Sequence, residues 1–339
     1  MTRPFQGLIM FIMILISFIF SISASADERV GFSIEAQLPD NQIDASVTYY
    51  DLRVDSDEEQ TLTLTIYNHE NEPLLVKGQV LNASTNSNGL VVYEDKEVDE
   101  SLSEPITELV ELSQDEWRIP AGQSITIEAQ LNMIDTSFDG IKLGGLRFEK
   151  ADDEDDESEG VSIQNKYAYV IGVRLSQNDN EVEPELELDS IIPGLVNYRT
   201  AVTANIRNTQ PIMMSDMKIK ATVFRGDETE PLHAVEQEEI KMAPNSVMPF
   251  VINWENSRLE AGEYRLEMTA TDGENGWRWD EDFQISTEDE TINEEAVELD
   301  ESTDGQSAQL WLIIGLGVLL VVIVILIFYI RKLKKKSGA

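Results

Sequence analysis

The sequence predicts an all-β fold: two tandem immunoglobulin-like β-sandwich domains, followed by an acidic stalk and one C-terminal transmembrane helix. Short segments with apolar residues at every second position recur from residue 32 to residue 285, as expected of strands that bury one face. Clusters of Pro, Asn, Asp and Gly separate these segments and mark turns. Near the carboxyl end, 21 uncharged residues form a long apolar stretch. The chain therefore divides into an exterior all-β part and a membrane anchor.

Residues 310–330 predict the membrane span. A helix of this length rises about 31 Å, close to the ~30 Å hydrocarbon core of a bilayer. Trp311 and Tyr329 lie one residue in from its ends, where aromatic rings favour the headgroup layer, and Arg331 and Lys332 begin a basic cluster typical of the cytoplasmic side. We expect a transmembrane helix at 309–330, a cytoplasmic tail at 331–339, and the preceding chain outside the cell.

The amino terminus has the pattern of a signal peptide at residues 1–26. Arg3 lies in a short polar start, residues 8–20 are apolar, and Ala24 and Ala26 form an A-x-A cleavage site. Cleavage there would leave a mature chain that begins at Asp27. Because the apolar run is fairly long, an uncleaved second membrane helix is the alternative.

The exterior part is strongly acidic and lacks cysteine. Its 64 Asp and Glu face 19 Lys and Arg, a net charge of −45. Such a charge repels nucleic acid and keeps a surface protein soluble. Without disulfides, each domain must bury a core large enough to be stable unaided. The composition favours a Gram-positive bacterial cell surface, with the protein held in the cell membrane by a single span.

The first domain is expected at residues 27–182. Residues 61–66 and 124–131 alternate apolar with polar positions, as in half-buried strands. Residues 152–159 (DDEDDESE) are too acidic for a strand and predict an exposed loop. Calcium is the alternative interpretation of this loop, but the glycine-punctuated spacing of a calcium loop is absent. We therefore expect no metal and no cofactor.

The second domain is expected at residues 183–287, where six segments have strand character. They are PELELDSI (184–191), RTAVTANIRN (199–208), MKIKATVF (217–224), VMPFVINW (247–254), EYRLEMTA (263–270) and GWRWDEDFQI (276–285). Trp277 and Trp279 share one face of the last strand, either to pack in the core or to form an exposed aromatic binding platform. Residues 288–308 carry many acids and no Lys or Arg, which predicts an extended, self-repelling stalk.

Little in the sequence indicates catalysis. The two histidines, His69 and His233, have no companion at metal-ligand spacing, and nucleophile elbows, P-loops and dinucleotide fingerprints are absent. Paired carboxylates could cleave a glycosidic bond, but among 64 acids such pairs arise by chance. The sequence favours a binding or scaffolding protein over a wall-active glycoside hydrolase.

Several longer strings resemble the WxL-interacting protein family. Strings that resemble its first domain are FSIEAQLPDNQ (32–42), YYDLRV (49–54), TNSNGLVVY (85–93), FDGIKLGGLRF (138–148) and YAYVIGVRL (167–175). Strings that resemble its second domain are KMAPNSVMPFVINW (241–254), EAGEYRLEMTA (260–270) and GWRWDEDFQI. The signal peptide, acidic spacer, membrane span and basic tail also match the family plan.

The resemblance implies a peptidoglycan-binding first domain, a second domain that binds host extracellular-matrix proteins, and WxL-domain surface proteins as partners. An acidic domain is repelled by the anionic polymers of the wall, so sugar binding needs a locally neutral groove with aromatic or amide contacts. Tyr49, Tyr50 and Tyr93, together with Tyr167 and Tyr169, could supply such contacts, although core packing explains them equally well. A stand-alone membrane-tethered adhesin without a WxL partner is the alternative function.

Glycine and proline positions suggest where backbones come close. Asp139 and Gly140 can form a tight turn with positive φ. Gly144 and Gly145, inside a strand, indicate a bulge or a close approach by another backbone, or else a ligand-facing edge. Pro249 cannot donate to a ladder, so residues 247–254 are expected to form an edge strand or a strand bulged at Pro249. An exposed edge there would let a partner strand add by β-augmentation.

Overall fold

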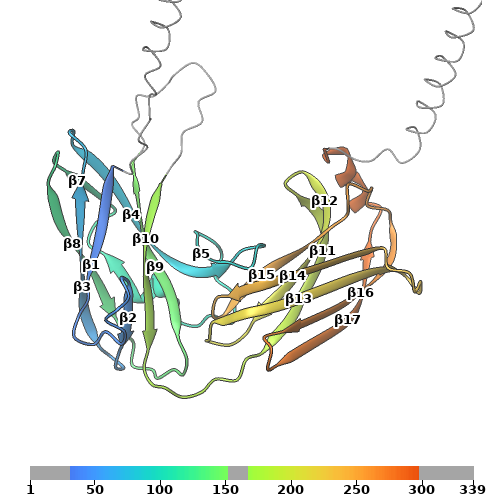
Figure 1. Ribbon diagram of the computed structural model, residues 1–339, viewed down its shortest axis with the longest axis horizontal. Helices are drawn as coiled ribbons and strands as arrows, with labels where there is room; N and C mark the ends of the chain where they lie inside the picture. Colours follow the sequence, from blue (N-terminus) through green and yellow to red (C-terminus); the bar gives the residue numbers. More distant parts are fainter. Residues whose placement is uncertain (1–30, 152–166, 298–339) are drawn as a thin grey trace, which may run out of the picture.

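The computed structural model describes residues 31–151 and 167–297, which form two β-sandwich domains (Figure 1). The first domain contains β1 to β10 and a short helix, α2. These elements are β1 (Phe32–Gln37), β2 (Tyr50–Arg53), β3 (Glu59–Asn68), β4 (Leu74–Thr85), β5 (Val91–Tyr93), α2 (Ile106–Leu109), β6 (Val110–Leu112), β7 (Glu116–Ile119), β8 (Ser124–Asn132), β9 (Lys142–Lys150) and β10 (Ala168–Ser176).

The two sheets of the first domain enclose one hydrophobic core. One sheet has the order β1-β3-β8-β6; the other has the order β2-β10-β9-β4-β5, with β7 also paired to β4. Alternation along β3 buries Leu62, Leu64 and Ile66 and leaves the threonines between them nearer the surface, as the sequence pattern predicts. Phe148 and Tyr50 fill this core from the second sheet.

The second domain is also a two-layer sandwich. Its strands are β11 (Leu186–Val196), β12 (Arg199–Asn208), β13 (Met214–Arg225), β14 (His233–Met242), β15 (Ser246–Asn253), β16 (Gly262–Thr271) and β17 (Gly276–Ile285). A sheet of order β11-β12-β15 packs on a sheet of order β14-β13-β16-β17. Residues 247–254 do contain an edge strand, β15, with Pro249 in it. The all-β prediction is confirmed for both domains.

The first residues of the predicted acidic stalk, after residue 287, pack on the second domain. A 3₁₀ helix, η1 (Asp289–Glu294), follows β17 and packs on the second domain through Ile292. Asn293 is buried: its side-chain oxygen accepts from the Leu259 amide at 2.8 Å, and its amide donates to the Leu259 carbonyl at 2.9 Å. One apolar side chain and one bonded amide therefore dock a segment whose composition predicts solvation.

The signal peptide, the acidic loop at 152–159, the residues 298–308 of the predicted stalk, the membrane span and the basic tail lie outside the described residues. The same holds for Ala24, Ala26, Trp311, Tyr329, Arg331 and Lys332. No helix within residues 31–151 and 167–297 is long and apolar enough to cross a membrane.

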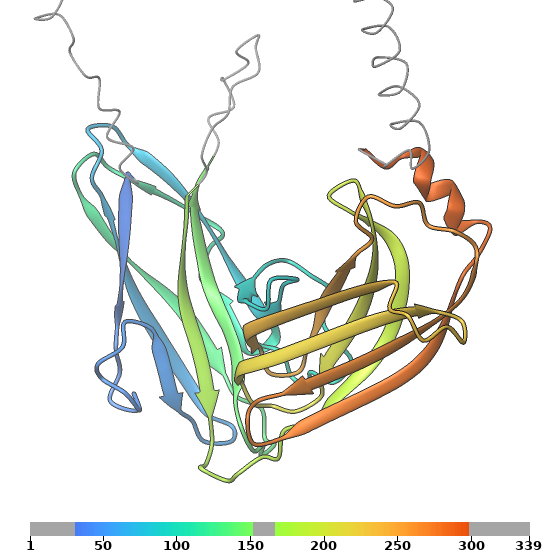
Figure 2. The ribbon, with the colours of Figure 1, turned by 45° about the vertical axis from the view of Figure 1, so that its right-hand side comes forward.

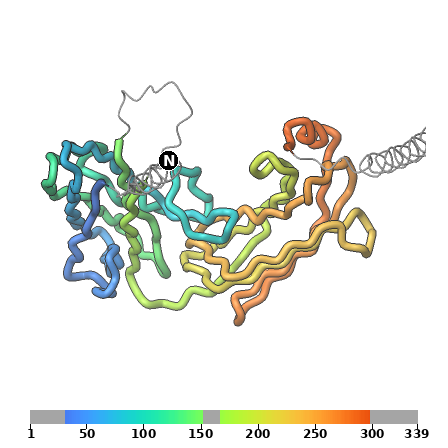
Figure 3. Tube along the Cα trace, turned by 45° about the horizontal axis from the view of Figure 1, so that its top comes forward, coloured from blue at the N-terminus to red at the C-terminus, as the bar shows by residue number. Residues whose placement is uncertain are grey.

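The end of β4 and the turn that follows it contact the second domain, and Figure 3 shows this part of the chain reaching that domain. The buried hydroxyls of Thr85 and Ser246 lie 2.7 Å apart, and the Thr85 oxygen also accepts from the Ala243 amide at 3.0 Å. The Lys241 amide donates to the Gly89 carbonyl at 2.8 Å. Because these bonds combine buried side chains with backbone groups, they fix how one sandwich sits against the other.

Candidate functional site

Two glycines form a shelf on the outer face of the first domain's β10-β9-β4 sheet. Figure 2 shows the strands of this sheet between the first sheet of the domain and the second domain. Gly172 of β10 and Gly145 of β9 are cross-strand partners. Tyr49 lies beside Gly172, with side-chain atoms 3.6–3.7 Å from where a Cβ would stand. The Tyr93 ring lies 3.1 Å from the Cβ position of Gly145, and Val170 lies 2.7 Å from it. We call these five residues the tyrosine platform.

The platform offers two tyrosine rings that differ in exposure. Tyr49 is 36% exposed and Val170 38% exposed, whereas Tyr93 is half-buried. Burial, and then the proximity of Tyr49, raises the pKa of Tyr93 above its ordinary value. The phenol therefore stays protonated and can both donate and accept hydrogen bonds. Flat rings with polar tips over a glycine shelf suit a ligand with an apolar face and hydroxyl groups.

Two arginines beside the platform are each paired with an acid. Arg174 bonds Asp51 across β10 and β2, and Arg147 bonds Glu149 at 2.8 Å along β9. Arg147 is the cross-strand partner of both Val170 and Gln79, so the platform continues into a groove on β9 and β4. This groove has a volume of about 320 Å³, and Gln79 and Lys77 line it. Pairing of opposite charges lowers the local field in an otherwise strongly acidic domain.

Of the tyrosine and glycine residues predicted to contact a ligand, some lie on the outer face of the sheet and others lie in the core. Tyr49, Tyr93 and Gly145 come together on the platform. Tyr50 is fully buried, and its hydroxyl donates to the Thr63 carbonyl at 2.6 Å. A Cβ on Gly144 would point inward, 2.6 Å from Ile106. Core packing therefore accounts for Tyr50 and Gly144, and they do not face a ligand.

Sequence reasoning missed Val170 and Gly172. Both lie in the string YAYVIGVRL, and alternation along it places them on the face opposite the buried Ile171 and Val173. That alternation could have marked the outward positions. Their closeness to Gly145 depends on the register between β9 and β10, which the sequence does not reveal.

Asp139 and Gly140 have structural roles. Gly140 has φ = +74°, as the predicted turn requires, and a Cβ there would lie 2.3 Å from the Pro211 carbonyl oxygen. The next amide, of Ile141, donates to that same carbonyl at 2.7 Å. Asp139 accepts hydrogen bonds from Asn178 and Asn180. This turn is therefore part of the contact between the domains.

Trp277 and Trp279 lie on the edge strand β17. Both are partly buried and pack against the hydrophobic core of the second domain. Of the two interpretations of this pair, their position supports core packing.

A cavity of about 510 Å³ lies between the two domains. Asn82, Glu94 and Lys96 line it from the first domain, and Asn205 and Pro249 line it from the second.

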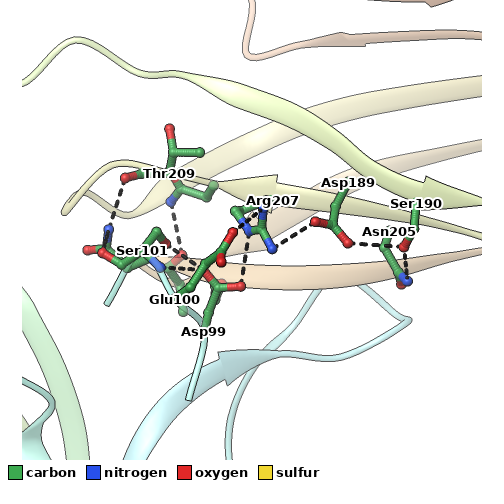
Figure 4. Close-up of polar contacts among 12 residues, drawn as sticks. Asp99, Glu100, Ser101, Asp189, Ser190, Asn205, Arg207 and Thr209 are labelled. Atoms are coloured by element: carbon green, nitrogen blue, oxygen red, sulfur yellow. Dashed lines mark hydrogen bonds and ion pairs between the residues drawn. The ribbon is translucent and has the colours of Figure 1, made fainter. Parts of the chain in front are cut away.

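Arg207, at the edge of this cavity, bonds acids of both domains (Figure 4). It contacts Asp99 at 3.0 Å and Glu100 at 3.2 Å in the first domain, and Asp189 at 2.7 Å in the second. Burial alone would raise the pKa of Asp99, but hydrogen bonds from Ser101 and Arg207 hold it below its usual range. Arg207 and Asp99 are 14% and 12% exposed, so this pair is shielded from solvent and connects the domains.

The histidines take part in packing and local bonding. His233 is buried with its ring 4.3 Å from that of Trp254, and burial lowers its pKa. His69 lies 2.7 Å from the Ser33 hydroxyl. Within the described ranges, no group of three or more His, Asp or Glu side chains could hold a metal ion.

Comparison with solved structures finds chaperones of fimbriae and pili. A structure of the chaperone-tip adhesin complex of CFA/I fimbriae biogenesis is 11% identical, covers 74% of this chain and 98% of its own, and has a TM-score of 0.31. The Acinetobacter baumannii CsuC–CsuE complex (9%, 65% and 89%, 0.30) and the E. coli chaperone DraB (12%, 75% and 98%, 0.28) are similar at the same level. No curated protein matches the chain.

Two family models match the chain in order. The peptidoglycan-binding domain of WxL-interacting proteins matches residues 32–150, and the host-binding domain matches residues 158–294. β10 falls within the second match, although it pairs with β9 and β2 in the sheet of the first domain. The matches extend to Glu294, in agreement with the docking of η1 on the second domain. The chain belongs to the WxL-interacting protein family.

Proposed function

We propose that this protein is a non-catalytic scaffold of the Gram-positive cell surface that holds WxL-domain proteins at the envelope. The first domain binds peptidoglycan glycan strands through the tyrosine platform, and the second domain is directed toward host extracellular-matrix proteins. A single membrane helix after the second domain anchors the assembly. The observation that carries the proposal is the platform itself, in which the exposed Tyr49 and the half-buried Tyr93 lie over a glycine shelf in the domain matched by a peptidoglycan-binding family.

The chemistry of the platform suits a sugar chain better than a charged ligand. Sugar rings have apolar faces that stack on aromatic rings, and their hydroxyls bond to phenol and amide groups. Tyr49 and Tyr93 offer the rings, and Gln79 in the adjoining groove offers an amide. Because Arg147 and Arg174 are each paired with an acid, neither is left as an isolated cation that would favour an anionic ligand.

The test of glycan binding uses residues 27–297 and purified, insoluble peptidoglycan in a sedimentation assay. Tyr49→Ala and Tyr93→Ala should each weaken binding by about tenfold, the effect of losing an aromatic contact of ~1.4 kcal/mol. Tyr198→Ala is the matched control, because Tyr198 is 69% exposed on the second domain, away from the platform. Equal binding by all four proteins would refute the platform as the glycan site.

The scaffold role is tested separately, with a purified WxL-domain protein in place of peptidoglycan. Stable complex formation with residues 27–297 supports the scaffold. The alternative, a stand-alone adhesin, is favoured if peptidoglycan and matrix proteins bind while the WxL-domain protein does not. The contacts between the domains favour an assay on both domains together, since Thr85, Gly89 and Arg207 join them.

A further inference from the structure

The edges of the four sheets differ in how well they are protected. An open strand edge presents unpaired backbone N–H and C=O groups, and natural proteins guard such edges with charges, prolines, bulges or short strands. An edge without any of these devices can accept a strand from another chain. We therefore compared the edge strands in the described part of the molecule.

The second domain protects its edges. β14 carries Glu236, Glu238 and Glu239, and its register with β13 shifts twice. β17 carries three successive acids, residues 280–282. β11 contains Pro193 and a register shift after Leu188. β15 contains Pro249, and its first residue, Ser246, is hydrogen-bonded to the first domain. These features disfavour the addition of a partner strand at β15, which the sequence suggested as a docking site.

The first domain protects most of its edges as well. β5 and β6 are three residues long, and β7 alternates Glu116 and Arg118 with buried residues. β1 carries Glu35 on its exposed side. The outer edge of β2 is covered by its own loop: the Ile43 amide donates to the Asp51 carbonyl at 2.7 Å, and the Arg53 amide to the Asn41 carbonyl at 3.0 Å.

β10 is the exception among these strands. Its residues 173–176 pair with β2, but residues 168–172 pair only with β9 within the described chain. The unpaired stretch reads Ala-Tyr-Val-Ile-Gly, so it has no charge and no proline, and its register with β9 is unbroken. Five residues of open edge extend about 17 Å, the length of an average strand.

Apolar side chains surround this open edge on the outer face. On this face Tyr49 and Val170 are 36% and 38% exposed, Val170 on β10 and Tyr49 beside it. On the inner face, Tyr169 contacts Phe32 of β1 edge to face, with ring centroids 5.1 Å apart. A strand placed next to β10 would therefore meet apolar surface on both of its faces.

Resting on the scaffold function proposed above, we propose that residues 168–172 of β10 pair with an extended segment of the WxL-domain partner, which adds a strand to the sheet in line with β2. A polypeptide is the occupant because only a peptide backbone offers donors and acceptors at the spacing of a strand edge. The segment carries small or apolar side chains at alternate positions, since its outer side chains lie beside Tyr49 and Val170.

Hydrogen–deuterium exchange on residues 27–297, free and bound to a purified WxL-domain protein, tests this pairing. In the free protein, amides of β10 that bond β9 exchange slowly, while alternate amides in residues 168–172 point to the open edge and exchange fast. Binding should slow these alternate amides by about a hundredfold or more, as expected when exchange requires opening of a hydrogen-bonded unit. Unchanged exchange in a complex that does form would overturn the pairing and leave the scaffold function standing.

A charge on the edge provides the second test. Val170→Lys adds the residue that natural edges use as protection, and it should weaken binding of the WxL-domain protein by about tenfold or more. Thr126→Lys is the matched control, because Thr126 is exposed on β8 in the opposite sheet and the added charge is the same. Equal weakening by both variants would show a general charge effect and overturn the proposal.

Tyr93→Ala distinguishes peptidoglycan binding at the platform from strand pairing at the β10 edge. This variant should weaken peptidoglycan binding by about tenfold while the alternate amides of β10 remain protected in the WxL complex. If it instead abolishes both, the partner lies on the outer face of the sheet and the edge pairing is wrong. If the WxL-domain protein does not bind the unmodified protein at all, both the scaffold function and the pairing fail.

Discussion

Two aromatic clusters, one in each domain, lie in opposite environments. In the second domain, Trp254 is 2% exposed and contacts His233 and Tyr264, and Tyr264 stacks on Phe283 with ring centroids 5.5 Å apart. In the first domain, Tyr49 and Tyr93 lie on an outer sheet face, over Gly172 and Gly145. The first arrangement contributes mainly to stability and the second mainly to a surface that can bind.

Glycine makes the difference between these arrangements. A side chain at Gly145 would meet Val170 at 2.7 Å and the Tyr93 ring at 3.1 Å, so the Tyr93 ring can lie this close to the strand because the Cβ is missing there. In the second-domain core, aromatic rings instead contact one another and bulky aliphatic residues. Substitution of an aromatic residue in the second-domain core should therefore lower stability strongly and change binding little. Substitution of a platform tyrosine in the first domain should weaken binding and change stability little.

The largest effect is expected for Trp254→Ala. Removing this ring from the core should lower the free energy of unfolding of the second domain by about 3–5 kcal/mol, because a large cavity remains. Urea unfolding followed by fluorescence and circular dichroism measures it. Tyr93→Ala is the counterpart on the platform and should change stability by less than about 1 kcal/mol, because the ring is only half-buried. Equal losses of unfolding free energy in the two variants would contradict the distinction between a core cluster and a surface platform.

Arg207→Ala tests the contact between the domains. Removing the guanidinium leaves Asp99 and Asp189 without their shielded partner, which should cost on the order of 1–3 kcal/mol. Arg225→Ala is the control, because the Arg225–Glu260 pair is exposed at 47% and 57% and should contribute below about 1 kcal/mol. Urea unfolding of residues 27–297 compares the two variants. If Arg207→Ala is as mild as Arg225→Ala, the network does not hold the domains together.

The stability of the second domain should also depend on pH through His233. Burial lowers its pKa in the folded protein below the ordinary 6.5, so the unfolded state takes up a proton first as pH falls. The contribution of the neutral ring is complete above about pH 7 and is lost as pH falls below ~6.5 toward the folded pKa, at up to about 1.4 kcal/mol per pH unit.

Thermal unfolding at pH 7.5, 6 and 5 measures this dependence, and His233→Gln should flatten it. His69→Gln, which removes the other histidine of the chain, is the control and should leave the slope of the second-domain transition unchanged. A wild-type transition that does not move between pH 7.5 and 5 would contradict the assignment to His233.

The sequence predicts the sandwiches well but not the platform. Period-two alternation identifies strands such as β3 and β8 together with their buried faces. The same alternation says that one of the adjacent tyrosines Tyr49 and Tyr50 is buried, without saying which. The platform further depends on the pairing of Gly145 with Gly172 across a loop, and on Tyr93 returning from β5. Docking of η1 depends on Asn293 and Ile292, two residues in an acid-rich segment.

The smallest effect is expected for the hydroxyl of Tyr93. Tyr93→Phe keeps the ring on Gly145 and should change the free energy of unfolding by no more than about 0.5 kcal/mol. If the phenol bonds a sugar hydroxyl, peptidoglycan binding should weaken by about two- to tenfold, the range of one neutral hydrogen bond of ~0.5–1.5 kcal/mol. Sedimentation with peptidoglycan compares Tyr93→Phe with Tyr93→Ala. If Tyr93→Phe binds as well as the unmodified protein while Tyr93→Ala binds more weakly, the ring contributes by stacking and its hydroxyl contributes nothing. If both variants lose the same affinity, the whole effect belongs to the hydroxyl, and the argument for stacking on the shelf is removed.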